Sequence, residues 1–176
     1  PLSHVFERMG GHFTAFSLGC SVYYAENIES VPNNLQETKP TIVLSVPRLY
    51  EKMYSKINEG LKSAPAIRRK IFNWAIKVGR QYNKYSLNGI TVPFSLKFKH
   101  KIAGKLVYTK IKKRFGGELR FFVSGGAPLS KEIGEFFSSA GITILEGYGL
   151  TETSPVLTAN SPQKLRYGTV GMPLFN

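Results

Sequence analysis

Cysteine is almost absent from this sequence of 176 residues, in which Cys20 is the single example. One thiol can form neither an internal disulfide nor a cysteine-rich zinc site, so the sequence excludes the small domains that depend on disulfides. This usage is typical of a reducing compartment, and we expect a cytoplasmic location. Because its neighbours in the chain are mostly apolar, we predict that Cys20 is a buried structural thiol.

Long hydrophobic runs and a signal peptide are missing as well. No stretch approaches the roughly 18 apolar residues that a membrane span requires. The composition is otherwise that of a globular domain with its own core, at 42% hydrophobic and 12% aromatic residues. The chain starts at Pro1, inside a motif described below, and stops at Asn176 without a terminating pattern, so we expect an internal fragment of a longer protein.

Acidic residues are scarce, and the resulting charge is local. The whole chain has 24 Lys and Arg against 11 Asp and Glu, a net charge of +13. Residues 62–120 contain sixteen Lys and Arg and one acid, Glu118, so this stretch carries +15 and the remainder −2. Two amphipathic helical patterns run through it, separated by a turn at Asn88-Gly89. Their apolar stripes are Ile67, Ile71, Trp74, Ala75, Val78 and Tyr82, and then Ile102, Leu106, Val107 and Ile111.

The densest group of chemically useful residues is at 146–155, directly after an apolar run. Residues 142–145 are rich in β-branched side chains and predict a buried strand that opens into this segment. Open α/β sheets hold ligands at such carboxyl ends. Gly147 and Gly149 allow backbone conformations with positive φ and let a ligand approach the main chain closely, while Tyr148 between them carries a flat apolar ring on which a purine can stack.

Thr151 and Glu152 follow as a hydroxyl beside a carboxylate. Magnesium takes oxygen ligands from one or two carboxylates and from substrate phosphates, so Glu152 is the candidate metal ligand and Thr151 the candidate phosphate donor. Spacing alone leaves open a plain glycine-rich turn with a solvated Glu152.

A second segment has the same design. Residues 119–123 predict a strand that ends in Ser124-Gly125-Gly126-Ala127-Pro128. A helix over 130–140, with Ser130 as its N-cap and Gly141 as its stop, would connect the two strands. Such crossovers are right-handed almost without exception, which brings both glycine segments to one edge of the sheet.

Four further elements complete the predicted fold. Residues 4–18 predict a helix and 21–25 a strand, 41–46 predict a fully buried strand, and Pro47 begins a helix that continues over 48–60. Together these elements predict the α/β class, with a mainly parallel sheet and helices on both faces.

The two glycine segments resemble a known family. Ser124-Gly125-Gly126-Ala127-Pro128-Leu129-Ser130, followed by Gly147-Tyr148-Gly149-Leu150-Thr151-Glu152, is similar to the adenylate-forming, AMP-binding superfamily of acyl-CoA synthetases, luciferases and peptide-synthetase adenylation domains. Residues 1–8, the stretches 39–41 and 46–52, and Phe115-Gly116-Gly117 resemble long-chain fatty acyl-CoA synthetases in particular. The resemblance implies that residues 1–176 are the middle part of the large N-terminal domain, with a basic helical insertion at about 62–115 and without the C-terminal domain.

The resemblance also implies an activity and a set of site residues. Such enzymes activate a fatty acid with ATP through an acyl-adenylate and then form a thioester with coenzyme A, so ATP, fatty acid and coenzyme A are the expected substrates and Mg²⁺ the expected ion. His4 would act as an imidazole donor beside the acyl carboxylate, and Glu152 with Thr151 would hold the metal. Expected nucleotide contacts are Gly125, Gly126, Ala127, Glu146, Gly147, Tyr148, Gly149 and Thr151. The fragment should not catalyse alone, because the family's phosphate loop, ribose-binding aspartate and C-terminal lysine lie outside it.

Other interpretations stay open at this stage. From the residues alone, His4 is a capping or packing residue at a helix start. The basic region fits a solvated face, or attraction to anionic lipid headgroups that would place the protein peripherally on a membrane, or attraction to the phosphates of coenzyme A. Nucleic acid is not expected, because no nucleic-acid-binding motif is present. The alternatives for function are an adenylation domain for another carboxylic acid and a basic non-catalytic module that binds anionic membranes or nucleic acid.

Overall fold

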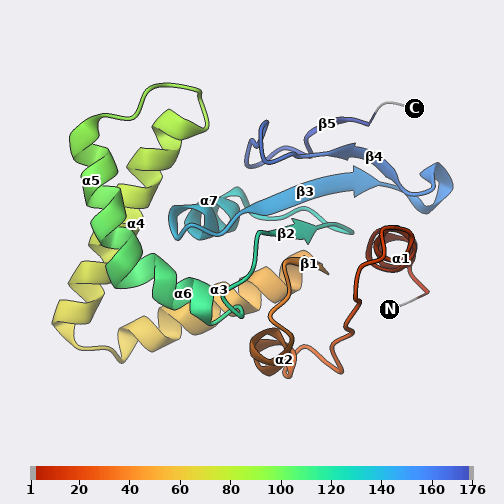
Figure 1. Cartoon of the computed structure of the whole chain (residues 1–176), viewed down its shortest axis with the longest axis horizontal. Coiled ribbons are helices and arrows are strands. Elements are labelled where there is room, and N and C mark those ends of the chain that lie inside the picture. Colours follow the sequence, from red (N-terminus) through yellow and green to blue (C-terminus); the bar gives the residue numbers. More distant parts are fainter. Residues whose placement is uncertain (1–2, 175–176) are drawn as a thin grey trace.

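A five-stranded sheet organises the computed structural model, which describes residues 3–174 (Figure 1). The strands follow chain order: β1 (Ile42–Ser45), β2 (Phe121–Ser124), β3 (Ile144–Gly149), β4 (Val156–Ala159) and β5 (Met172–Pro173). The first three are parallel, whereas β4 and β5 add in antiparallel fashion. The predicted α/β class is confirmed, and the antiparallel hairpin beyond β3 is a feature that the sequence analysis did not include.

Successive side chains along each strand point to opposite sides, so the sheet has two distinct faces. The register pairs Val43 with Phe122 and Phe122 with Ile144, so these side chains share one face. Phe122 is fully buried there, with its ring centroid 5.3 Å from that of Tyr50 and 5.6 Å from that of Phe115. The Tyr50 hydroxyl donates to the carbonyl of residue 123 at 2.7 Å, which ties the helix after β1 to β2.

Most of the helices pack on this first face or extend from it. They are α3 (Pro47–Lys62), α4 (Ala66–Ser86), α5 (Phe94–Ala103), the π-helix η2 (Gly104–Tyr108), α6 (Thr109–Lys113) and α7 (Lys131–Ser139). A Cβ on Gly79 would overlap the carbonyl of Ser139, so α4 and α7 cross in direct backbone contact at this glycine. The predicted stripe of α7 is buried: Ile133, Phe136, Phe137 and Ala140.

The second face is partly covered by the N-terminal segment, so helices lie on both faces as predicted. Residues 7–13 form the π-helix η1 (Glu7–Phe13), which continues as α1 (Thr14–Ser17). Here again glycine permits close approach: a Cβ on Gly10 would lie 2.9 Å from Leu44, and one on Gly125 would lie 2.8 Å from the Phe6 ring.

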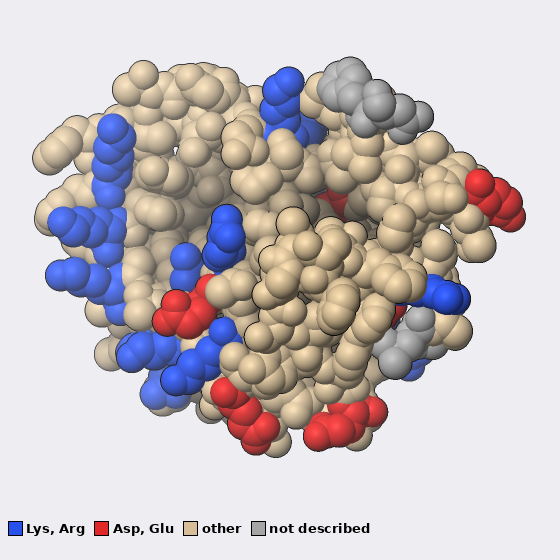
Figure 2. Space-filling view, turned by 45° about the vertical axis from the view of Figure 1, so that its right-hand side comes forward, with Lys and Arg blue, Asp and Glu red and all other residues tan. Residues whose placement is uncertain are grey.

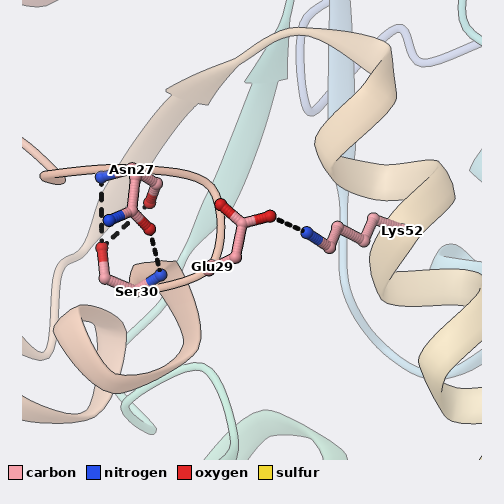
Figure 3. Close-up of polar contacts among 4 residues, drawn as sticks. All are labelled: Asn27, Glu29, Ser30 and Lys52. Carbon is pink, nitrogen blue, oxygen red and sulfur yellow. Dashed lines mark hydrogen bonds and ion pairs between the residues drawn. The ribbon is translucent and has the colours of Figure 1, made fainter.

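Polar contacts fasten the loop between α1 and α2 (Val31–Thr38), as Figure 3 shows. Asn27 Oδ1 accepts from the Ser30 N–H at 2.8 Å, and Ser30 Oγ accepts from the Asn27 N–H at 3.2 Å. Glu29 pairs with Lys52 of α3, and this hydrogen bond lowers the pKa of the Glu29 carboxyl. The loop is therefore held to α3, although an exposed pair of this kind adds little stability.

Two predictions for the N-terminal third were wrong. Residues 21–25 form no strand and Cys20 is exposed rather than buried. Gly19, at φ 68°, follows the end of α1, and Tyr23 in the segment after it is 66% exposed. A β-prone sequence gains nothing without a neighbouring strand, since its stability comes from pairing and packing.

The predicted burial also needs correction at three places. The strand before Pro47 is an edge strand, and Ile42 is 40% exposed rather than fully buried. In α4 only the second half of the predicted stripe is covered, because Ala75 and Val78 are buried while Ile67 is 74% exposed. The side chain of Ser130 makes no capping hydrogen bond, although it stands at the N-cap position of α7.

The basic residues lie mainly over the helical part of the molecule. Figure 2 shows most of the visible Lys and Arg on the left side, with a few elsewhere, and carboxylates scattered between the sides. Within residues 3–174, no helix has both the length and the hydropathy that crossing a bilayer demands.

Candidate functional site

A cavity of about 530 Å³ lies between the carboxyl edge of the parallel strands and the N-terminal segment. Its floor is the second face of the sheet and is apolar: Ile42, Leu44, Phe121, Val123 and Leu145. Its rim is polar and includes His4, Glu146, Tyr148, Thr151, Glu152 and Asn160. One space therefore joins an apolar surface to a set of hydrogen-bonding and charged groups, which is typical of small-molecule sites.

Nearly all of the predicted site residues line this cavity. The structure brings together His4, Gly125, Gly126, Glu146, Gly147, Tyr148, Gly149, Thr151 and Glu152. Ala127 is the exception: it is exposed and does not line the cavity. Tyr148 is 47% exposed, so its ring is free to meet a flat ligand.

Gly147 and Gly149 do not use the positive φ that glycine allows. Both belong to β3, which continues through the expected loop and pairs with β4, and neither adopts positive φ. Gly149 is needed for another reason: a Cβ there would overlap the carbonyl of Pro155 at the irregularity where the ladder shifts register. Gly126 does have the positive φ, 81°, that favours glycine.

A hydroxyl that the sequence analysis did not single out shapes the turn that carries Thr151 and Glu152. Residues 151–153 form a single turn of 3₁₀-helix. Thr153 Oγ1 accepts from the Leu150 N–H at 2.9 Å and lies 2.7 Å from the Pro155 carbonyl, to which it donates. No capping signature in the sequence marks this contact, because Leu150 at the N-cap position has no side-chain oxygen. This hydroxyl fixes the direction in which the two candidate ligand side chains leave the backbone.

His4 is positioned by capping the first turn of its helix. Its Nδ1 accepts from the Phe6 N–H at 3.2 Å. A neutral imidazole that accepts at Nδ1 carries its proton on Nε2, so the other nitrogen is a donor. The capping and the donor interpretations of His4 are thus compatible, because the cap uses one nitrogen and leaves the other for a ligand.

Glu146 is the buried acid of the site, with 7% of its surface exposed. Burial raises the pKa of its carboxyl above the usual range, while hydrogen bonding with the backbone at Leu129 and Gly168 opposes this rise. The backbone carbonyl of Glu146 accepts a hydrogen bond from the backbone N–H of Asn160 at 2.8 Å. The strand register places the Glu146 side chain on the face opposite the cavity floor, towards Leu129 and Gly168, so its main chain is the part that follows the cavity edge.

The residues present fit a magnesium ion held mainly by a substrate. In the described part of the chain no three His, Cys, Asp or Glu side chains are grouped as a metal site. What the cavity offers is the exposed Glu152 carboxylate next to the Thr151 hydroxyl. This donor set suits Mg²⁺, which commonly takes one or two carboxylates and completes its octahedron with phosphates and water.

Several lining residues were missed by the sequence analysis. Phe6 and Gly10 dock the N-terminal helix on the sheet, as described above, and both line the cavity. Asn160 is 5% exposed, donates from Nδ2 to the Thr169 carbonyl at 2.7 Å and accepts at Oδ1 from the Arg166 N–H at 3.1 Å. Strand alternation could have revealed the apolar floor, but no local signal marks Asn160, whose partners are set by the fold.

An α/β protein with a polar cavity at the carboxyl edge of its parallel strands belongs to the class that holds nucleotides or related ligands at that edge. Comparison with known proteins identifies the family within this class. The model of the AMP-binding enzyme family matches residues 1–176, and the chain belongs to that family.

Curated proteins that are similar in sequence align with almost the whole of this chain. It is 37% identical over 174 residues to a long-chain-fatty-acid–CoA ligase, FadD15, of Mycobacterium bovis, covering 99% of this chain and 28% of the relative. It is 35% identical over 175 residues to the peroxisomal long chain acyl-CoA synthetase 6 of Arabidopsis thaliana, covering 98% and 23%. The chain thus spans about a quarter of the length of these relatives.

Solved structures agree on the fold. A benzoate CoA ligase from Burkholderia xenovorans LB400 matches with a TM-score of 0.58 at 21% identity, over 98% of this chain and 26% of that one. An anthranilate CoA ligase solved in complex with anthranoyl-AMP gives the same TM-score at 18% identity, over 98% and 24%.

Proposed function

We propose that the protein containing this chain joins a long-chain fatty acid to coenzyme A, with ATP consumed to form an acyl-adenylate first. The observation that carries the proposal is the single cavity in which an apolar floor meets the Thr151–Glu152 turn and His4. The names of the relatives support the same activity. This chain supplies part of the site, and the remaining groups would come from elsewhere in the protein.

The nucleotide would lie along β3 and the segment after β2. Tyr148 offers an exposed ring for the adenine, and the backbone at Gly126 and Gly147 permits close approach. Glu146 lines the cavity next to Gly147, where its main chain would lie beside the base or ribose. These groups bind and orient, which is their contribution to rate: a reactant held in place reacts without the entropic cost of a chance encounter.

The phosphates would lie at the Thr151–Glu152 turn. Glu152 would hold Mg²⁺, whose chemistry is to offset the negative charge that develops on the leaving pyrophosphate. The Thr151 hydroxyl would donate to a phosphate oxygen. Thr153 holds the turn in the conformation that presents both side chains.

The acyl group would lie on the apolar floor, with its carboxylate towards His4. The imidazole Nε2–H can donate to a carboxylate or to an α-phosphate oxygen, and such a donor stabilises the charge that moves between them in the transition state. The floor buries the chain of a fatty acid, and each methylene removed from water contributes about 0.8 kcal/mol. This is the reason for preferring a long aliphatic acid to a small polar one.

Peripheral contact with anionic membranes is part of the proposal. The basic helices α4 to α6 carry most of the excess charge and leave Ile67 and Phe98 exposed beside it. Lysine and arginine near an anionic surface each contribute about 1 kcal/mol to binding. Contact of this kind would place the enzyme next to its lipid-soluble substrate.

The test is the Glu152→Gln variant of the complete protein, assayed by ATP–pyrophosphate exchange with palmitic acid at saturating Mg²⁺. Losing the carboxylate should lower the rate by about a hundredfold or more, or ~2.7 kcal/mol in transition-state stabilisation. Glu59→Gln, in an exposed part of α3, is the matched control and should keep the wild-type rate. A wild-type rate for Glu152→Gln would remove the metal-binding role, and exchange that depends on benzoic but not on palmitic acid would overturn the proposed substrate.

A further inference from the structure

A second cavity, of about 600 Å³, lies between α4, α7 and the loop that follows β4. Three segments far apart in the sequence line it: residues 80–88, residues 131–139 and residues 165–167. None of its lining residues belongs to the first cavity. It is therefore a separate site, to which the function proposed above assigns no role.

The cavity is strongly cationic. Arg80, Lys84, Lys131 and Arg166 line it together with one carboxylate, that of Glu135. Glu135 is already engaged, with its Oε1 3.8 Å from the Nζ of Lys131. Among residues 3–174, no carboxylate lies within ion-pair distance of the other three cations. The lining thus carries a net charge of +3, and most of that charge is not neutralised by side chains of residues 3–174.

The walls that carry these cations are held in place by contacts around the cavity. Helices α4 and α7 touch at Gly79, as described above, and Asn83 Nδ2 donates to Ser138 Oγ at 2.8 Å. The loop that carries Arg166 is fixed by buried Asn160, which accepts from the Arg166 N–H. Fixed walls matter, because a ligand then meets charges whose backbone positions require no ordering on binding.

We propose that this second cavity binds a phosphate group, carried either by a soluble phosphorylated molecule or by an anionic lipid headgroup. Two guanidinium groups and two ammonium groups around one concave space suit a phosphate, since arginine binds it through two parallel N–H groups and lysine as a point charge. All four line one hollow of about 600 Å³, which is large enough for a phosphate with its substituents.

The experiment compares two double variants on the same helix of the complete protein. Arg80→Gln with Lys84→Gln removes two cavity cations, whereas Arg68→Gln with Lys70→Gln removes one arginine and one lysine from exposed positions outside the cavity. Calorimetric titration with pyrophosphate measures phosphate binding at the second cavity, at low salt and with a non-hydrolysable ATP analogue saturating the nucleotide and phosphate positions of the first cavity. We expect the cavity variant to bind at least roughly tenfold more weakly, since two nearby charges are lost, and the control to stay within about twofold of wild type. Arg166→Gln, on a different segment, should also weaken binding.

Two results would overturn the proposal. One is equal weakening by both double variants, which would indicate diffuse surface charge. The other is the absence of saturable binding by the wild-type protein below about 10 mM, an affinity too weak for a built site. The KM for ATP is followed in parallel and should not change in the cavity variant, so a failure here is distinguishable from a failure of the proposed enzyme function.

Vesicle sedimentation separates the two sources of phosphate. The probe is phosphatidylcholine vesicles with and without phosphatidylglycerol. The site is assigned to a lipid headgroup if two results are found together. The cavity variant loses more vesicle binding than the control variant does, and pyrophosphate displaces the wild-type protein from the vesicles. The site is assigned to a soluble phosphate if the cavity variant binds pyrophosphate tenfold more weakly while both double variants bind vesicles equally well.

Discussion

The Thr153 hydroxyl offers a sharp test of how the candidate site is held together. Thr153→Val keeps the shape of the side chain and removes the oxygen that accepts from the Leu150 N–H at 2.9 Å. The same oxygen lies within reach of two carbonyls, those of Leu150 at 3.0 Å and Pro155 at 2.7 Å, but it has one proton to donate. The variant therefore loses about two hydrogen bonds, each with a net value of about 0.5–1.5 kcal/mol.

The turn at 151–153 should then be destabilised by about 1–3 kcal/mol relative to its alternatives. If the whole effect falls on the transition state, adenylation slows by roughly 5- to 150-fold. We expect the loss to appear as weaker apparent binding of Mg²⁺ in pyrophosphate exchange, because Glu152 is presented by this turn. The melting temperature should change little, since the turn is a small exposed part of the fold.

Thr153→Ser is the matched control, because it retains the hydroxyl and removes a methyl group. It should recover most of the activity and the wild-type Mg²⁺ dependence. The reasoning fails if serine is as damaging as valine, or if Thr153→Val shows the wild-type Mg²⁺ titration. Either result would mean that the hydroxyl does not position the ligand side chains.

Three further outcomes are expected. His4→Ala should slow the reaction of acid with ATP and leave ATP affinity nearly intact in single-turnover kinetics; a collapse of nucleotide affinity with an unchanged chemical step would contradict its placement beside the carboxylate. Replacing Arg68, Arg69 and Lys70 together by Gln should weaken binding to anionic vesicles by about 3 kcal/mol at most, an effect that fades with salt, whereas wild-type binding would leave these residues as a solvated face. Burial raises the pKa of Glu146, so its charged form costs stability at neutral pH and the cost disappears as the pH falls towards the unfolded value of about 4.3. Glu146→Gln should therefore be more stable than wild type at pH 7 in urea titrations and lose this advantage near pH 4, and an advantage independent of pH would contradict that account.

The order of elements around the site could be predicted from local patterns. The apolar runs before the two glycine segments, the stripe of α7 and the stop at Gly141 are all signals of short range, and the structure confirms them. The crossover rule then placed both segments at one edge. This is why most of the predicted site residues share a cavity although they were chosen without coordinates.

The errors arose where burial depends on partners distant in sequence. Nothing local shows that β1 is an edge strand, that residues 21–25 have no strand beside them, or that the first half of the α4 stripe stays exposed. The glycines of β3 illustrate the same limit. Their residue type suggested a loop, whereas the pairing with β4 keeps them in a strand and gives Gly149 a steric reason to be glycine.

Strand β3 has a different kind of neighbour at each end, parallel β2 first and antiparallel β4 afterwards. Ile144 at its beginning is fully buried, while Val156 in β4 and Met172 in β5 are 37% and 43% exposed. Local opening should therefore start in the hairpin, and amides from residue 147 onward should exchange with solvent faster than those at 144 and 145. The turn with Glu152 joins β3 to β4, so it would lose its shape each time the hairpin opens. A ligand that needs this turn would bind only the closed hairpin, and its occupancy could be followed as slower amide exchange in β4, with no catalysis required.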